Sequence, residues 1–122
     1  MSRDRRNFYR IRTVLPVTIR REQDEDEAPL APMSIDISGG GIGFHTNSQY
    51  EPGDILALTI AVSENELIRA KARVVSRRRL EHENDGLHIG AAFIEISQGH
   101  REALIRYVMR LQAERLDKHY LA

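Results

Sequence analysis

The chain has 122 residues, about one domain, and its 18 Lys and Arg residues balance 18 Asp and Glu residues, so its formal charge is zero. With 41% hydrophobic and 30% charged residues it has a globular composition, and the zero net charge excludes the basic coat of a typical nucleic-acid-binding protein. The absence of cysteine excludes disulfides, thiol nucleophiles and cysteine-based metal centres.

Residues 1–13 are polar and rich in arginine, and we expect them to form a flexible arm. Their apolar residues are too few to offset an ordering entropy of about 1–2 kcal/mol per residue; they are Phe8, Tyr9 and Ile11. No apolar stretch follows the basic start, so we expect no signal peptide. No apolar run approaches the ~18 residues that a bilayer span needs, so we expect no membrane insertion and a cytoplasmic location.

Six strands are predicted after the arm, because apolar and polar residues alternate with a period of two. We expect them at residues 14–21, 33–38, from 42 onward, 55–62, 68–76 and 87–96. An acidic hairpin loop joins the first two, and the glycines of residues 39–41 form a turn that tolerates positive φ. In the turn Glu51-Pro52-Gly53-Asp54, the positions of Pro and Gly suit type II.

A helix is predicted over residues 98–117, with Ser97 as its N-cap. Its apolar residues Leu104, Val108 and Leu111 recur at the spacing of one helical face. Short strands at this spacing, followed by one helix, predict a small antiparallel β-barrel or sandwich over residues 14–122.

Catalysis is not indicated by the sequence. None of the five histidines has a partner at a metal-binding spacing, so we predict no metal site. Ser38 precedes glycines but no helix follows it, so it is not a nucleophile elbow. We interpret the chain as a non-enzyme with no catalytic residue; an unrecognised hydrolase would need a nucleophile–base pair that assembles only in space.

Two short motifs point to ligand binding. Arg6-Asn7-Phe8-Tyr9-Arg10 reads R-x-x-x-R and is preceded by Arg5, and Asp36-Ile37-Ser38-Gly39-Gly40-Gly41 reads D-x-S-x-x-G. Either motif alone is common in unrelated chains. The pair in this order, about 25 residues apart and ahead of a series of strands, is much more specific.

This pair of motifs resembles the PilZ domain family, whose members are bacterial receptors for cyclic di-GMP. The resemblance extends from about Arg5 to about Leu116 and includes the turn Pro52-Gly53-Asp54, the stretch Lys71-Ala72-Arg73-Val74-Val75 and the stretch Gly90-Ala91-Ala92-Phe93. It implies an all-β fold: a six-stranded antiparallel barrel with one C-terminal α-helix.

The resemblance also implies a ligand site. Arg6 and Arg10 would hold guanine edges and phosphates, and Asp36, Ser38 and Gly41 would hold the other guanine. The chemistry agrees, because guanine O6 and N7 match the donors of an arginine fork. The guanine N1–H and N2–H₂ groups need a carboxylate or hydroxyl acceptor, which one strand face supplies.

Two further residues complete the predicted site. Gly40, like Gly41, lets the backbone approach a flat base without an intervening Cβ. Arg5 is placed to stack on a second nucleotide, which would favour an intercalated cyclic di-GMP dimer. Alternative roles stay open: Asp36 as a cap of the glycine turn, and the arginines as a solvated tail.

The sequence therefore predicts a cyclic di-GMP receptor without a cofactor, which changes conformation on binding and signals through contact with an unidentified protein. The main alternative is a PilZ-like adaptor that binds no nucleotide. A small RNA- or single-strand-binding barrel would need stacking aromatics and a basic face, whereas aromatic residues are only 6% and the net charge is zero.

Overall fold

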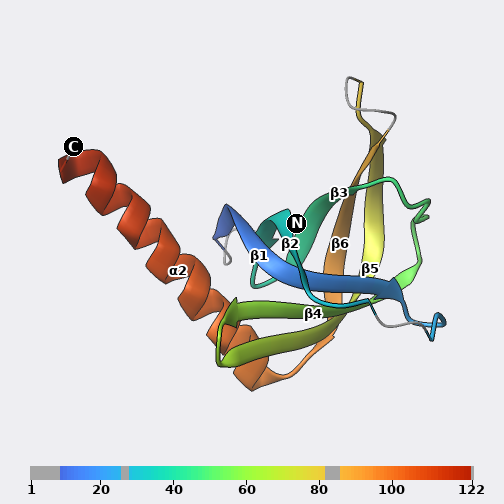
Figure 1. The fold of residues 1–122 in the computed structure, drawn as a ribbon, viewed down its shortest axis with the longest axis horizontal. Coiled ribbons are helices and arrows are strands. Elements are labelled where there is room, and N and C mark those ends of the chain that lie inside the picture. Colours follow the sequence, from blue (N-terminus) through green and yellow to red (C-terminus); the bar gives the residue numbers. More distant parts are fainter. Residues whose placement is uncertain (1–8, 26–27, 82–85, 122) are drawn as a thin grey trace, which may run out of the picture.

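A computed structural model describes residues 9–25, 28–81 and 86–121, and side chains up to residue 116. Its described strands form a closed antiparallel barrel followed by one long helix (Figure 1). The elements are β1 (Arg10–Arg21), β2 (Ala31–Ser38), β3 (Gly41–Thr46), β4 (Ile55–Ser63), β5 (Glu66–Arg79), β6 (Leu87–Ile96) and α2 (Gln98–Leu121). Around the barrel the order is β1-β2-β3-β6-β5-β4. The predicted fold class is confirmed.

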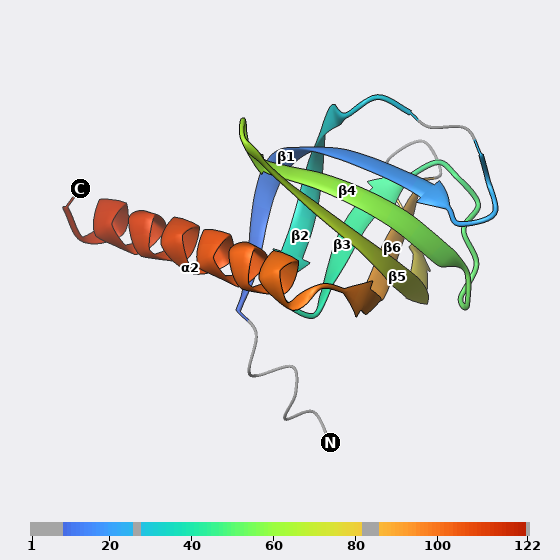
Figure 2. The same ribbon diagram turned by 90° about the horizontal axis from the view of Figure 1, so that it is seen from below.

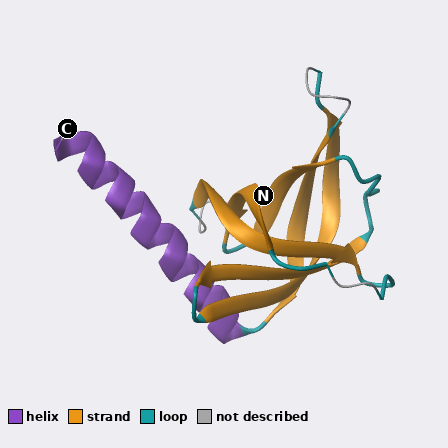
Figure 3. Ribbon diagram, in the orientation of Figure 1, coloured by secondary structure: helices purple, strands orange, loops and turns teal. Residues whose placement is uncertain are grey.

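The barrel interior is filled by the inward residues of each strand. Ile35 and Ile37 on β2, Ile60 on β4 and Ile89 on β6 are fully buried. Their outward neighbours are more polar or smaller, so burial follows the period of two that the sequence shows. This alternation is why the strands, drawn in orange in Figure 3, could be predicted from sequence.

The N-terminal boundary of the barrel differs from the prediction. β1 begins at Arg10 rather than at residue 14, because residues 10–13 pair with residues 35–38 of β2. Ile11 lies in the core, while Arg10 and Arg12 are exposed. The exposed arginines made this part of the strand look like a polar segment in the sequence, although its inward face is apolar. Of the segment expected to be an arm, residues 1–8 lie outside the described residues.

Helix α2 packs its first half on the barrel. Leu104 and Val108 are buried, and the helix contacts β1, β2 and β5. The hydroxyl of Tyr107 is 3.0 Å from that of Thr13 on β1. The Oγ of Ser97 accepts the backbone N–H of His100, which confirms the predicted N-cap. The second half of α2 projects away from the barrel (Figure 2).

The glycines of two turns are required for different physical reasons. Gly53 has φ +96°, and the N–H of Asp54 donates to the carbonyl of Glu51, which confirms the type II turn. None of the three glycines at residues 39–41, all of which the structure describes, has a positive φ. Gly41 is needed for another reason: a Cβ there would collide with the backbone carbonyl oxygen of Ala91 on β6.

Replacing Gly41 by alanine is therefore expected to destabilise the protein. The clash is with backbone, which cannot rotate away, and overpacking of this kind costs about 1–3 kcal/mol. Gly99→Ala is the control, because nothing lies within 4 Å of a Cβ added there and alanine favours a helix by up to about 1 kcal/mol. Urea unfolding of both variants measures the difference. A Gly41→Ala variant as stable as Gly99→Ala would contradict the predicted clash.

Candidate functional site

The register of three neighbouring strands brings the predicted site residues together on the outer face of the barrel. Arg10 on β1 lies opposite Ser38 on β2, and Ser38 lies opposite Gly41 on β3. One rung further, Asp36 lies opposite Arg12 on one side and Gly43 on the other. Two cross-strand rows thus place Arg10, Asp36, Ser38 and Gly41 beside one another. Arg5 and Arg6 lie outside the described residues.

Asp36 is held by an arginine that the sequence analysis did not select. The Nε of Arg12 donates to Oδ1 of Asp36 at 3.1 Å, and its Nη2 donates to Oδ2 at 3.4 Å. The Arg12 side chain is 71% exposed and that of Asp36 only 21%. The largely covered carboxylate of Asp36 thus accepts two hydrogen bonds from a guanidinium that is itself exposed to solvent.

One histidine lies beside the same carboxylate, and a second histidine contacts the first. The Nε2 of His88 is 3.9 Å from Oδ2 of Asp36, and the His88 ring meets that of His45 edge-on at 5.1 Å. Gly43 leaves room for His88, since a Cβ on Gly43 would be 3.3 Å from the His88 Nε2. Arg12, Asp36, Gly43, His45 and His88 help to line a hollow of about 40 Å³. It is too small to enclose a nucleotide.

The electrostatics of the site keep Asp36 ionised. Partial burial raises the pKa of Asp36, but the hydrogen bond and charge of Arg12, aided by His88 and Arg10, outweigh burial and hold this pKa below its usual value. Burial lowers the pKa of His88, as does the electrostatic effect of the neighbouring His45 and Arg78, against the opposing effect of Asp36. Near neutral pH the site therefore presents a carboxylate beside a neutral imidazole.

Ser38 rather than Asp36 caps the glycine turn. Its side chain is buried, and its Oγ accepts the backbone N–H of Gly40 at 3.1 Å. The carbonyl of Gly40 in turn accepts the N–H of Phe93 on β6. Ser38 and Gly40 thus serve the β2–β3 turn, and Asp36, whose carboxylate pairs with Arg12, is not the cap considered from sequence.

The residues that sequence reasoning missed are set by strand pairing. Arg12 carries a local signal, since it lies two residues after Arg10 and shares its outward face. Gly43 becomes relevant only through its place opposite Asp36, and His88 only through the pairing of β3 with β6. These pairings join distant parts of the chain, which a motif search does not reveal.

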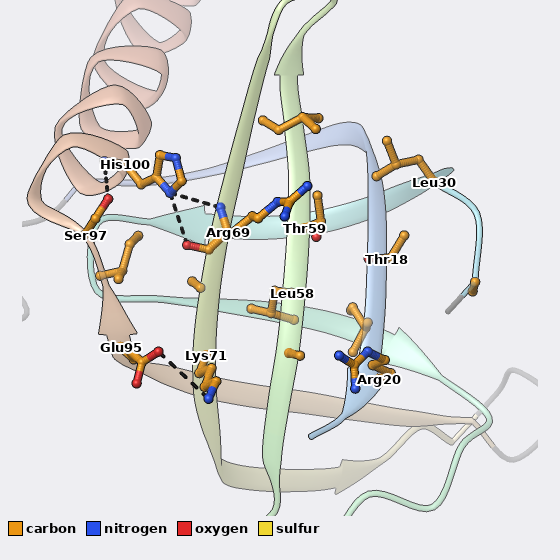
Figure 4. A pocket seen from close by; sticks show the side chains of 16 residues that line it. Thr18, Arg20, Leu30, Leu58, Thr59, Arg69, Lys71, Glu95, Ser97 and His100 are labelled. Atoms are coloured by element: carbon orange, nitrogen blue, oxygen red, sulfur yellow. Dashed lines mark hydrogen bonds and ion pairs between the residues drawn. The ribbon is translucent and has the colours of Figure 1, made fainter. Parts of the chain in front are cut away.

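A larger hollow of about 500 Å³ lies elsewhere on the barrel, across β1, β4 and β5 beside the start of α2 (Figure 4). Arg20, Arg69, Lys71, Glu95 and His100 are among its lining residues. The Nδ1 of His100 accepts the backbone N–H of Arg69, and Lys71 pairs with Glu95 at 3.9 Å. It contains no residue of either motif, so we assign the candidate site to the surface around Asp36.

The described parts of the chain contain neither a metal-ion cluster nor a membrane-spanning helix. Within them, no three His, Asp or Glu side chains are grouped so as to hold a metal ion. Within the same ranges, no helix combines the length and apolar character that crossing a membrane requires.

Comparison with known proteins links the chain to one family by sequence. The sequence model of the PilZ domain matches residues 4–110. A comparison with curated proteins gives no match.

Solved structures share the fold at low sequence identity. MotI/DgrA, the inhibitor of motility of Bacillus subtilis, is 24% identical with a TM-score of 0.71 over 88% of this chain, which spans about half (51%) of that protein. A tetrameric PilZ domain from Xanthomonas campestris is 17% identical, with a TM-score of 0.68 over 90% of this chain and 91% of its own. The PilZ domain of YcgR from Escherichia coli, solved with c-di-GMP, is 18% identical, with a TM-score of 0.65 over 97% of this chain and 99% of its own.

The lowered pKa of Asp36 predicts how acid acts on stability. A carboxyl group with a pKa lower in the folded than in the unfolded state stabilises the fold fully above its unfolded pKa of about 3.9. That contribution is lost as the pH falls through the folded pKa. The difference in Tm between wild type and Asp36→Asn should therefore be constant above about pH 5 and shrink below about pH 4. Thermal melts across this range test it, and parallel profiles down to the lowest pH would refute it.

Proposed function

The chain belongs to the PilZ domain family, and we propose that it is a receptor for cyclic di-GMP that signals through contact with another protein. The observation that carries the proposal is the cross-strand arrangement of Arg10, Asp36 and Ser38 on one outer face. The fold that the chain shares with a domain solved with c-di-GMP supports the ligand class.

The chemistry of the two rows suits a guanine nucleotide. The N1–H and N2–H₂ groups of guanine are neighbouring donors, which the ionised carboxylate of Asp36 can accept together. Arg10, one rung away and exposed, offers donors to guanine O6 and N7 or to a phosphate. In this proposal the hydroxyl of Ser38 adds a contact, and the backbone of Gly40 and Gly41 approaches the base.

The surface around Asp36 is shallow, which leaves room for the preceding chain to cover a bound ligand in this proposal. The hollow beside Asp36 holds about 40 Å³, so a bound nucleotide would lie on the barrel rather than within it. We propose that Arg6 and Arg5, which precede β1, close over the phosphates. Stacking of Arg5 on a second nucleotide would favour an intercalated dimer of cyclic di-GMP.

The output is proposed to be a change in the surface presented to an unidentified protein. β1 carries Arg10 and Arg12 in its first half, which pairs with β2, and Thr18 and Arg20 in its second half, beside β4. The second half also lines the 500 Å³ hollow. Closure of the chain before β1 would therefore act on a strand that reaches both regions. We place this activity in the bacterial cytoplasm, without a cofactor or catalysis.

One observation favours a second candidate, an adaptor that binds no nucleotide. The carboxylate of Asp36 already has two donors from Arg12, so the site is electrostatically satisfied without a ligand. In this alternative the motif residues stabilise the barrel surface, and the protein acts through partner contacts alone. Titration of the wild-type protein with cyclic di-GMP distinguishes the two.

Arg10→Ala is expected to weaken cyclic di-GMP binding about tenfold or more, because hydrogen bonds to charged groups contribute about 1.5–3 kcal/mol. Arg6→Ala should act in the same direction. The exposed Arg69, which lies on β5 outside the motif surface, provides the matched control Arg69→Ala. Calorimetric titration gives the affinities, and circular dichroism checks the fold. Equal affinities of Arg10→Ala and Arg69→Ala would argue against a role for Arg10.

Asp36→Ala is expected to damage binding more than Asp36→Asn does. The asparagine amide oxygen can still accept a hydrogen bond from one guanine N–H group, although this bond lacks the contribution of the carboxylate's charge. Alanine has no acceptor and makes no such bond. Dissociation constants and melting temperatures are to be measured on the same samples. If both variants lose thermal stability but keep the wild-type affinity, Asp36 is a structural residue and does not contact the ligand.

A further inference from the structure

The contact between Arg12 and Asp36 has the geometry of a ligand contact. The guanidinium presents Nε–H and Nη2–H to separate carboxylate oxygens, at 3.1 and 3.4 Å. The N1–H and N2–H₂ edge of guanine would likewise present two adjacent N–H donors to the two carboxylate oxygens. Arg12 therefore occupies the oxygens that the proposed ligand requires.

The surroundings of Asp36 leave little room for both partners. Only 21% of the side chain is exposed. Arg12 approaches from β1 and His88 from β6, with its Nε2 3.9 Å from Oδ2. A guanine edge that meets both carboxylate oxygens in their plane would have to take the place of the guanidinium.

We propose that Arg12 is a built-in competitor for Asp36, which a guanine nucleotide must displace and which thereby sets the affinity of the site. This inference rests on the proposed function. It assigns to Arg12 a role opposite to that of Arg10: both project from the same face of β1, but Arg10 adds to binding and Arg12 opposes it.

The exposure of Arg12 makes such displacement feasible. Its side chain is 71% exposed, so the guanidinium is already largely hydrated while paired, and its release from Asp36 changes its hydration little. Exposed ion pairs are weak, and this one is expected to reduce ligand affinity by roughly two- to fivefold. The competitor thus adjusts the affinity without abolishing binding, and it keeps Asp36 paired when no ligand is present.

A mutant cycle tests the competition. Cyclic di-GMP is titrated calorimetrically into wild type, Arg12→Met, Asp36→Ala and the double variant. Arg12→Met also removes a positive charge near the phosphates, and the Asp36→Ala background measures that effect alone. For each background we compare the affinity of the Arg12→Met variant with that of its parent. We expect this ratio to be roughly two- to fivefold higher in the background that retains Asp36 than in the Asp36→Ala background. The control Arg69→Met should show no such dependence on Asp36.

Two results would overturn the competition. An equal effect of Arg12→Met in both backgrounds would show that Arg12 acts by charge alone. A larger loss of affinity with Asp36 present would show that Arg12 helps Asp36 to hold the ligand. Carbon-detected NMR of the Asp36 carboxyl gives a second readout, because loss of Arg12 should raise the pKa of Asp36; an unchanged pKa would exclude the pairing itself.

The titrations also distinguish a failure of the proposed function from a failure of this inference. Absence of binding by wild type and by Arg12→Met alike would refute the cyclic di-GMP receptor and, with it, the competition. Binding by Arg12→Met but not by wild type would refute the receptor function of the natural chain and support the competition, with Arg12 a stronger competitor than its exposure suggests.

Discussion

The pairing of β2 between β1 and β3 is the constraint on which the candidate site depends. It sets Asp36 opposite Arg12 and Gly43, and Ser38 opposite Arg10 and Gly41. A slip of one residue would turn Asp36 and Ser38 toward the interior and Ile37 toward solvent. Because Ile35 and Ile37 are fully buried, the hydrophobic core that holds the barrel together also fixes the register of the site.

The site combines a structural ion pair with a candidate recognition group. The same carboxylate of Asp36 that the Arg12 fork stabilises is the acceptor that a guanine edge would need. Burial alone would favour the protonated acid, but Arg12 more than compensates, so the acceptor is kept ionised in the free protein. In the proposed competition, the free and bound states would differ in which donor hydrogen-bonds to the carboxylate, rather than in whether the carboxylate is charged.

β1 connects two separate surfaces of the barrel. Its first half borders Asp36, and its second half, which pairs with β4, lines the larger hollow with Thr18 and Arg20. A strand embedded in a closed barrel moves as part of a packed unit, so a change at Arg10 and Arg12 is not confined to their own rung. This continuity gives the proposed signalling route a physical element to act through.

Local pattern in the sequence determined the strands, the type II turn at Gly53 and the Ser97 cap, because alternation, proline–glycine turns and helix caps depend on near neighbours. The two motifs likewise indicated Arg10, Asp36 and Ser38. Local pattern missed the start of β1, because Arg10 and Arg12 flank a single apolar residue, Ile11. The tertiary structure alone decided that Arg12 holds Asp36, that His88 lies beside it and that Gly41 makes room for Ala91, because each contact joins strands that are distant in the chain.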